Sequence, residues 1–593
     1  MDLLYWNISN FVVLVTSLFQ LNFIVASCFD KFPAEEKLVL TPLPTNYLLA
    51  SFMFELDSHS IKKIELDEIT NDSNYQAFPK VLGPIFESTN VTELHLKFAR
   101  GYWDAEKWGK LPNNGEFSGG TGVELWSTID ANSEEEAFAQ WEILVNYLSG
   151  LFCASMNFID KTTTTYPQKL FEDTSKYENR YLLRSVLPKE PVCTENLTPF
   201  LRLLPTKGKA GISSLLDGHQ LFYSPWHSMS IDIKPKLNSS KGELHMSQHI
   251  DQLINIPSTF EYFRSPIPKP VSGDALRCDD NKRHDLYYCF PKESINNLSY
   301  ELKDLFGKEI ENRLLIGKGK SEICFDSTEE WKISGVTETI EGISINKEPP
   351  FDINLSDKFN VKIETSQSGK VKKIDYPNIF VSRSFTGYRE DSGGIRIVFK
   401  NPSLERAVRL VYFESLPWYM RIYLHTLELI ERLENLIIKE VYFQPSVDRK
   451  RPGQIELELI IPPNSIISMN YKFDKSLLLY SEYPPDANHG FELDPSVVKV
   501  IGDSSRSEKD YFFRTTSLLL SLPTPDFSMP YNVIIFTSTV MALTYGTIFN
   551  LLIKRLINEE ETEGNSKNNI LKRLKQKFLV KLKSTIQKNK SQQ

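Results

Sequence analysis

An uncharged apolar run of 23 residues near the C-terminus constrains this chain more than any other feature. Residues 531–553 (YNVIIFTSTVMALTYGTIFNLLI) follow Pro530 and precede the basic residues Lys554 and Arg555. A helix of about 20 apolar residues is long enough to cross a bilayer. A buried core helix is the alternative. The length and the flanking basic pair favour a transmembrane helix whose C-terminal side faces the cytosol.

A second apolar run stands at the start of the chain. Residues 11–25 (FVVLVTSLFQLNFIV) precede the small residues Ala26 and Ser27, which is typical of a signal peptide over residues 1–27. Asp2 is the only charge before this run, where Lys or Arg is usual, so a retained anchor is the competing interpretation. The run is shorter than a span requires, which favours a signal peptide and hence a type I protein with its bulk in the lumen.

Small and polar residues recur along one face of the predicted membrane helix. Ser538, Ala542, Gly546 and Asn550 are spaced four apart. Such residues allow helices to approach closely and to form interhelical hydrogen bonds in a membrane. We expect this face to pack on membrane helices of partner proteins. The alternative is that the hydroxyl groups of the span bond back to their own helix.

Charge divides the chain into an acidic body and a basic tail. Residues 554–593 hold 11 Lys and Arg against four Glu, and subtracting this +7 from the net charge of −8 leaves −15 for the preceding residues. A body without a broad basic surface does not favour nucleic-acid binding. In the cytosolic tail, residues 570–583 place apolar side chains on one helical face between lysines. This pattern favours a helix on an anionic membrane surface over a solvated, partly formed helix.

The region between the two apolar runs carries glycosylation sequons, as a lumenal body would. The six acceptor positions are Asn71, Asn90, Asn196, Asn238, Asn297 and Asn354. Because Asn-x-Ser/Thr also arises by chance, we expect only some of them to be used.

The cysteine count indicates a covalent partner or a free thiol. Cys28 lies at the predicted cleavage point, which leaves an odd five in the mature body: Cys153, Cys193, Cys278, Cys289 and Cys324. An odd number in an oxidising compartment predicts one intermolecular bridge or one free thiol. Cys278 and Cys289 enclose a short polar loop and are a candidate intrachain disulfide. No Cys-x-x-Cys pair is present, so we expect no zinc or other metal site and no cofactor.

Periodicity predicts a mainly β fold with some α. Residues 134–152 carry apolar side chains at helical spacing and predict one packed helix. Alternating segments predict strands over residues 395–399, 409–413, 419–429, 455–461 and 467–473. We therefore expect three regions before the span: an N-terminal lumenal α+β domain (28–300), an irregular boundary region (301–371) and a membrane-proximal lumenal β-sandwich (372–530).

The catalytic motifs are weak. EDSGG at residues 390–394 is similar to the nucleophile loop of trypsin-like proteases, but its flanking residues differ and no histidine stands in the matching context upstream. A hairpin turn before a strand is the expected structure. His245 and His249 lack the glutamate of HExxH and predict a surface pair. Cys193 has no sequence-local base.

Several long strings resemble the PIG-T family of GPI transamidase subunits. VCTENLTPF at residues 192–200 is the most recognisable, and GKAGISSLLDGHQLF at residues 208–222 is similar to fungal members. The other strings are LKFARGYWDAEKWGKLP (96–112), GVELW (122–126), SGLFCASMNFID (149–160), FESLPWYMRIYLHTL (413–427), EYPPDANHGFELDPSV (482–497) and LPTPDFSMPYNVI (522–534). The resemblance runs from about residue 40 to the end of the span.

The resemblance implies a non-catalytic subunit of a complex in the endoplasmic-reticulum membrane. In that family a caspase-like subunit supplies the catalytic Cys and His. The complex cleaves the C-terminal signal of a proprotein and joins the new end to the ethanolamine of a GPI lipid. The family's cysteine in the VCTENLTP string forms a disulfide to the catalytic subunit, which implies that role for Cys193. Other membrane subunits of the complex are implied partners.

Two other functions stay open at this point. An independent lumenal hydrolase would need a nucleophile and base that the motifs do not supply. A cargo receptor or lectin-like lumenal binding protein would need an escort signal in the tail. Lys590 lies four residues from the end without a strict dilysine arrangement.

Overall fold

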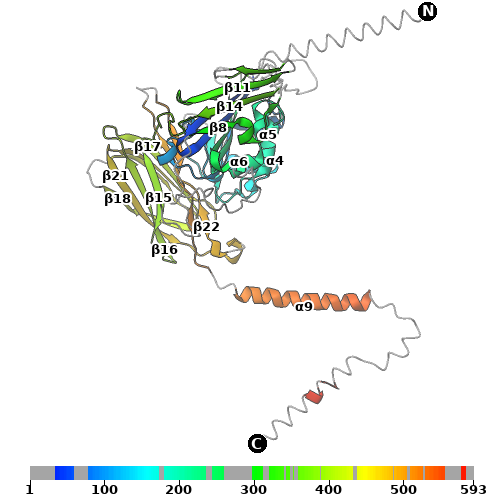
Figure 1. Cartoon of the computed structure of the whole chain (residues 1–593). Coiled ribbons are helices and arrows are strands. Elements are labelled where there is room, and N and C mark those ends of the chain that lie inside the picture. The colour runs from blue at the N-terminus through cyan, green and yellow to red at the C-terminus, as the bar shows by residue number, and fades with distance from the viewer. Residues whose placement is uncertain are drawn as a thin grey trace, which may run out of the picture. The chain divides into compact units, whose positions relative to one another are not determined.

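The computed structural model describes most of the body and the apolar C-terminal helix (Figure 1). The described residues are 34–58, 78–171, 179–235, 244–259, 297–311, 320–339, 342–346, 351–352, 358–387, 389–431, 437–484, 487–503, 508–524, 528–553, 576–577 and 579–581. The expected signal peptide (1–27) and most of the tail helix (570–583) lie outside them. The chain divides into two compact units, Met1–Pro523 and Thr524–Gln593.

A nine-stranded sheet organises the N-terminal half of the larger unit. Its strand order is β13-β10-β1-β2-β7-β6-β3-β4-β5, antiparallel except between β1 and β10. The strands are β1 (Ala34–Leu43), β2 (Tyr47–Asp57), β3 (Val91–Gly101), β4 (Gly122–Asp130), β5 (Arg180–Leu187), β6 (Trp226–Pro235), β7 (Leu244–Asn255), β10 (Lys320–Phe325) and β13 (Phe351–Asp352).

Helices cover the apolar face of this sheet, and α4, α5 and α6 gather on one side of this half (Figure 1). The helices are α2 (Leu82–Thr89), α3 (Ala105–Trp108), α4 (Glu134–Phe152), α5 (Thr194–Leu203), α6 (Gly218–Tyr223) and α8 (Leu302–Phe306). The predicted helix over 134–152 is confirmed as α4. It begins at Ser133, whose hydroxyl oxygen accepts from the Glu136 N–H at 3.2 Å, and it buries Trp141 and Leu148.

The region expected to be an irregular boundary, 301–371, is instead folded into the N-terminal half. A five-stranded sheet contains β8 (Leu298–Glu301), β9 (Ile310–Glu311), β11 (Trp331–Thr339), β12 (Gly342–Asn346) and β14 (Lys358–Thr365). Phe359 and Ile363 are buried in the same core as Trp141. The prediction rested on the charged composition of the whole region and overlooked the alternation of polar and apolar residues in β14 (KFNVKIET). Only one face of such a strand is buried, so its composition resembles that of a loop.

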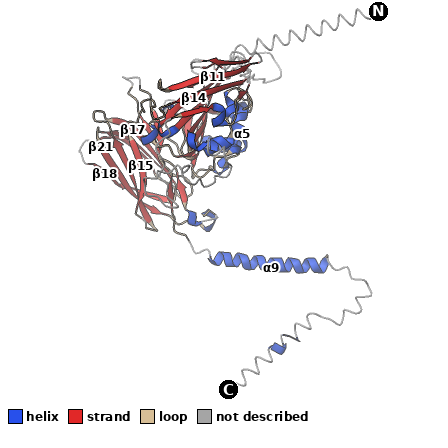
Figure 2. Ribbon diagram, viewed as in Figure 1, coloured by secondary structure: helices blue, strands red, loops and turns tan. Residues whose placement is uncertain are grey.

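A β-sandwich forms the C-terminal half of the larger unit, and strands dominate this half (Figure 2). One sheet contains β15 (Phe380–Thr386), β16 (Ser392–Asn401), β18 (Met420–Glu431) and β21 (Ser465–Lys475). The other contains β17 (Val408–Leu416), β19 (Ile437–Gln444), β20 (Gly453–Ile461), β23 (Val497–Val500) and β24 (Tyr511–Arg514). A small sheet pairs β22 (Phe491–Leu493) with β25 (Leu518–Leu520). All five strands predicted by alternation are confirmed.

Buried polar contacts join the two halves. The Glu456 carboxylate on β20 accepts from the backbone N–H groups of Gln168 at 2.7 Å and Lys169 at 2.8 Å. Arg514 on β24 reaches the Glu124 carboxylate on β4 at 3.1 Å. Two hydrophobic cores therefore belong to one compact unit, because these contacts leave no solvated linker between them.

The predicted membrane helix is present as α9 (Ser528–Leu552), in which Met529–Leu552 is long and apolar enough to span a bilayer. Four threonine hydroxyls donate to carbonyls of their own helix: those of Thr537, Thr539, Thr544 and Thr547. The hydroxyl groups of these threonines therefore have hydrogen-bond partners within α9. None of the four threonines belongs to the stripe formed by Ser538, Ala542, Gly546 and Asn550.

Candidate functional site

Cys193 lies at the position that caps the N-terminus of α5. Its backbone N–H donates to Asn196 Oδ1 at 2.9 Å, so the residue three positions into the helix fixes the backbone of the cysteine. The thiol is free and half-buried. Glu195 in the first turn complements the positive end of the helix dipole. The fold thus presents this thiol from a defined backbone rather than from a loose loop.

Asn196 is a structural residue, which corrects its prediction as a glycosylation site. It is 1% exposed, and its Nδ2 donates to the carbonyls of Phe152 at 3.0 Å and Cys153 at 3.4 Å. An N-linked glycan is attached to this same nitrogen and needs solvent around it. The buried, bonded amide leaves no room for one. The amide instead ties the start of α5 to the end of α4.

The other predicted modification sites divide between the described residues and the rest of the chain. Asn90 and Asn297 are exposed, as an acceptor must be. Cys153 is exposed and free at the end of α4, and Cys324 is free and half-buried on β10. Outside the described residues lie Asn71, Asn238, Asn354, Cys28, Cys278 and Cys289.

The sheet face opposite the helices is polar, charged and buried. On β3, Leu94, Leu96 and Phe98 point into the apolar core. The alternate residues His95 and Lys97 must therefore point to the other face. Registered neighbours extend this face across the sheet: Glu124 and Trp126 on β4, Arg184 on β5, and Ser230 and Asp232 on β6. Each of these side chains is 9% exposed or less.

The buried charge of Asp232 on this face is compensated by its neighbours. His95 Nδ1 lies 2.5 Å from Asp232 Oδ1, and the Ser230 hydroxyl donates to the same carboxylate at 2.8 Å. Burial alone would raise the pKa of Asp232, but the hydrogen bond and charge of His95 lower it to about 2. This carboxylate is therefore ionised at any physiological pH.

Glu124 on this face shows the same compensation, whereas Lys97 is compensated only in part. Burial opposes ionisation of Glu124, yet Arg514 and Arg184 hold the pKa of its carboxyl well below the usual range. Burial, followed by the charge of Arg514, lowers the pKa of the Lys97 ammonium to about 8. Lys97 also donates to the backbone carbonyl of Glu116. The charged side chains of this face thus stabilise one another. Among the described residues, no cluster of His, Cys, Asp or Glu is suited to bind a metal ion.

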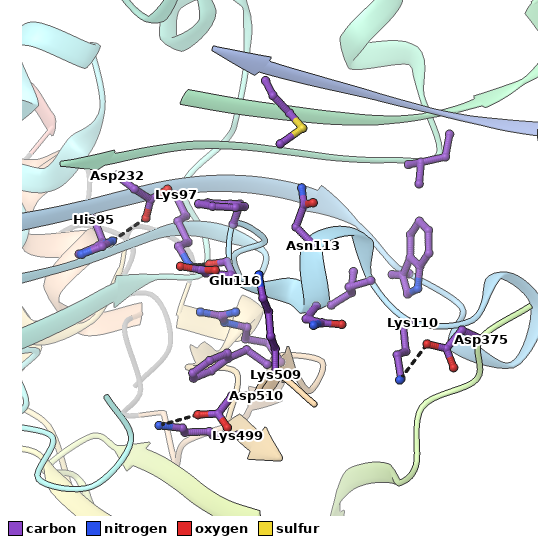
Figure 3. A pocket seen from close by; sticks show the side chains of 18 of the residues that line it. His95, Lys97, Lys110, Asn113, Glu116, Asp232, Asp375, Lys499, Lys509 and Asp510 are labelled. Atoms are coloured by element: carbon purple, nitrogen blue, oxygen red, sulfur yellow. Dashed lines mark hydrogen bonds and ion pairs between the residues drawn. The ribbon is translucent and has the colours of Figure 1, made fainter. Parts of the chain in front are cut away.

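A cleft of about 1110 Å³ opens over this face (Figure 3). Its walls come from the sheet, from the segment that carries Lys110 and Asn113, and from the sandwich residues Lys499 and Asp510. Ion pairs line it at Lys110–Asp375 (2.9 Å) and Lys499–Asp510 (3.2 Å). Its volume is that of a site for a small molecule or a part of a larger ligand.

The prediction of a surface histidine pair is wrong for His249. His245 is partly exposed and lies 2.7 Å from Asp57 Oδ1. His249 is 2% exposed, stacks on Phe117 with ring centroids 3.5 Å apart, and contacts the Ser247 hydroxyl at 2.6 Å. Burial lowers the pKa of His249 to about 4, so its ring is neutral. The missing HExxH glutamate argued against a metal site but carried no information on burial, and β7 places His249 inside the polar face.

The protease-like motif EDSGG follows the turn between β15 and β16, where a hairpin was expected. His425 and Asp474 line the same hollow as Ser392. The Ser392 hydroxyl nevertheless donates to Asp391 at 3.3 Å, and Asp474 accepts from the Tyr423 hydroxyl at 2.6 Å. These contacts connect neither the serine nor the carboxylate to His425, so they do not form a charge relay.

Sequence reasoning did not identify the polar face. The signal is present in LHLKFAR (94–100), where polar residues alternate with Leu94, Leu96 and Phe98. Alternation predicts a half-exposed strand. That the polar half is covered by another part of the chain depends on contacts such as Glu124–Arg514, which no local pattern reveals.

Fold and site together define a mainly β protein with one apolar helix suited to a membrane and a charged internal cleft. A family described as "Gpi16 subunit, GPI transamidase component" matches residues 16–579. The chain belongs to this family.

Its relatives match over nearly their whole lengths. The chain is 44% identical to "GPI transamidase component GPI16" of Saccharomyces cerevisiae, over 93% of this chain and 94% of that protein. It is 33% identical to "GPI transamidase component PIG-T homolog" of Schizosaccharomyces pombe (92% and 94%) and 30% identical to "GPI-anchor transamidase component PIGT" of Homo sapiens (91% and 93%). The solved major pilin SpaD of Corynebacterium diphtheriae shares a TM-score of only 0.18 over 32% of this chain and 60% of that one, too little to indicate a common fold.

Proposed function

We propose that this chain is a non-catalytic subunit of the GPI transamidase in the endoplasmic-reticulum membrane. Its body holds the caspase-like catalytic subunit through a disulfide at Cys193 while proprotein C-termini receive GPI anchors. The relatives' names as GPI transamidase components support the complex. The half-buried free thiol of Cys193, fixed at the N-terminus of α5, is the single observation that supports the covalent link.

The expected topology follows from the position of the apolar helix. A type I orientation places residues 28–530 in the lumen and the basic tail (554–593) in the cytosol. The exposed asparagines Asn90 and Asn297 are then available for glycosylation. Family membership favours this assignment over a cargo receptor, a lectin-like module or an independent hydrolase.

The stripe on α9 is the proposed contact with other membrane subunits of the complex. The threonine hydroxyls bond to carbonyls of their own helix and are not needed for this contact. We propose that a partner helix approaches closely at Ala542 and Gly546. Ser538 and Asn550 then form hydrogen bonds to that helix. An added Cβ at Gly546 would meet no atom within 4 Å of this chain, so this position has space for a neighbouring backbone.

A non-reducing gel tests the proposed disulfide. Membranes that contain the wild-type chain are expected to yield a high-mass adduct with the catalytic subunit, which reductant dissolves. Cys193→Ser is expected to abolish this adduct. Cys153→Ser, which removes the neighbouring exposed thiol, and Cys324→Ser are the matched controls and leave it intact. An unchanged adduct in Cys193→Ser would show that the bridge lies elsewhere.

A further inference from the structure

The cleft contains hydrogen-bond donors that the protein itself does not use. Trp126 is 9% exposed and its Nε1 has no hydrogen-bond partner among the described residues, and the same holds for Trp108 Nε1. Both residues line the cleft. A buried donor without an acceptor costs about 1–3 kcal/mol. An acceptor that reaches either indole nitrogen from the cleft would remove this cost.

Aromatic rings stand beside these donors. Trp126 is stacked between His95 (3.6 Å between centroids) and Phe171 (4.2 Å), which fixes the direction of its N–H. Trp103 packs edge-on against Trp108 at 5.3 Å, and both are half-exposed in the cleft. Rigid indole rings offer apolar faces of about the size of a sugar ring, with a polar donor at the edge.

Cations predominate over acids in the cleft although the body is acidic. Nine Lys and Arg and seven Asp and Glu line it. Most of these acids already have a cation, as in Lys110–Asp375, Lys372–Asp326 and Lys499–Asp510. Lys373 and Lys509 are exposed at the cleft, and no ion pair joins either to a described carboxylate. The unsatisfied charge of the cleft is positive, which suits a phosphate.

We propose that this cleft binds a phosphorylated oligosaccharide. Sugar rings lie against Trp103 and Trp108, hydroxyl oxygens accept from the indole N–H of Trp126, and a phosphate meets Lys373 and Lys509. If the proposed function holds, the head group of the GPI lipid is the ligand of this class, and the identity of the ligand rests on that proposal.

An extended peptide is the less suitable occupant. A peptide backbone needs donors and acceptors in equal number along its length. The carboxylates of the cleft are engaged by cations, and the Glu116 carbonyl accepts from Lys97. The indole N–H groups of Trp108 and Trp126 and the ammonium groups of Lys373 and Lys509 match the many acceptor oxygens of a phosphorylated glycan.

Binding to the purified complex tests this proposal. The complex is isolated in detergent through a tag on this chain. The probe is the water-soluble head group that phosphatidylinositol-specific phospholipase C releases from GPI lipid. The same glycan stripped of phosphate by hydrofluoric acid, inorganic phosphate and an uncharged extended peptide are the comparison ligands. Affinity is measured by microscale thermophoresis for wild type and variants.

The variants separate the two parts of the site. Trp126→Phe keeps an aromatic ring but removes the N–H, and is expected to weaken both glycan forms about threefold to tenfold, the worth of one hydrogen bond. The double variant Lys373→Gln/Lys509→Gln is expected to weaken only the phosphorylated form, about tenfold. Lys450→Gln, an exposed lysine outside the cleft, leaves both unchanged. The two lysine changes are on the surface and do not disturb folding.

Each other outcome has a clear meaning. If complexes with the cleft variants assemble normally and bind the phosphorylated glycan as tightly as wild type, the cleft assignment is wrong. The proposed function is unaffected by this result. Full competition by inorganic phosphate alone, or binding of the peptide that depends on the same residues, also overturns the cleft assignment. If the tagged chain recovers no other subunits, the proposed function fails instead. Binding to the isolated full-length chain then decides the cleft assignment separately.

Discussion

Asp251 shows how single residues set the pH response of this fold. It lies on β7 in the polar face, is 1% exposed and is paired in register with Ser51 of the adjacent strand. Burial raises the pKa of its carboxyl to about 7, and the nearby Ser51 hydroxyl opposes this only in part. The contrast with Asp232, whose pKa is lowered by His95, shows that a counter-charge decides the direction of the shift.

The variant Asp251→Asn tests this burial. Between about pH 4 and pH 7 the unfolded carboxyl loses its proton while the folded one keeps it. The stability contributed by Asp251 therefore falls as pH rises through this window. The asparagine variant is expected to unfold at a higher temperature than wild type at pH 8, by up to about 4 kcal/mol in free energy, and with little difference at pH 4. Thermal unfolding in detergent at both pH values measures this. A difference of equal size at both would contradict it.

At the scale of elements, Asn196 holds together the end of α4 and the start of α5. Its side chain bonds to Cys193, Phe152 and Cys153, and therefore sets the backbone from which the Cys193 thiol projects. The same asparagine begins a sequon that ends at Thr198. A glycan and a buried bridge are incompatible roles for one side chain, and the contacts decide for the bridge.

Two variants separate these roles. Asn196→Ala is expected to destabilise the fold by about 1–3 kcal/mol and to reduce the Cys193 adduct on non-reducing gels, because buried backbone groups lose their partner. Thr198→Ala is the matched control. It destroys the sequon but leaves the buried amide in place, and its exposed hydroxyl bonds only within α5, to the Thr194 carbonyl. We expect no change in gel mobility or adduct for Thr198→Ala. A faster-migrating band would show that Asn196 carries a glycan.

Elements were predictable from sequence where the spacing of their own apolar residues was regular. Helix α4 carries Phe138, Trp141, Leu144 and Leu148 at helical spacing, and its predicted bounds are those observed. Five strands of the sandwich (β16, β17, β18, β20 and β21) were found for the same reason. Strand β10 was missed because its partner β1 lies far away in sequence, and β14 because the region around it is charged.

At the scale of the whole molecule, buried polar contacts and an apolar cluster of Leu170, Phe413 and Val497 couple the two cores. Glu456 accepts two backbone N–H groups of the N-terminal half, and Arg514 shares Glu124 with Arg184. Removing one partner of a buried ion pair costs about 3–5 kcal/mol, because the other charge is left in a low-dielectric surrounding. We infer that these contacts make the two halves unfold together.

The double variant Glu456→Ala/Arg514→Met tests this coupling. Scanning calorimetry is expected to show one transition for the larger unit of the wild-type chain, and two transitions or a clearly lowered first one for the variant. The control Glu458→Ala lies two residues further along β20 and removes a pairing with Arg409 inside the sandwich. It is expected to lower stability slightly without splitting the transition. A single unshifted transition in the double variant would refute the coupling.

The sequence by itself determined the apolar C-terminal helix, the mainly β character, the helix α4 and five strands of the sandwich. Each of these depends on residues that are close in the chain, through an uncharged run or a repeated spacing. Tertiary structure alone decided that Asn196 and His249 are buried, that β10 pairs with β1, and that a charged cleft exists. The physical reason is distance along the chain. The cleft depends on pairs such as Glu124 and Arg514, 390 residues apart, whose contact only the folded molecule creates.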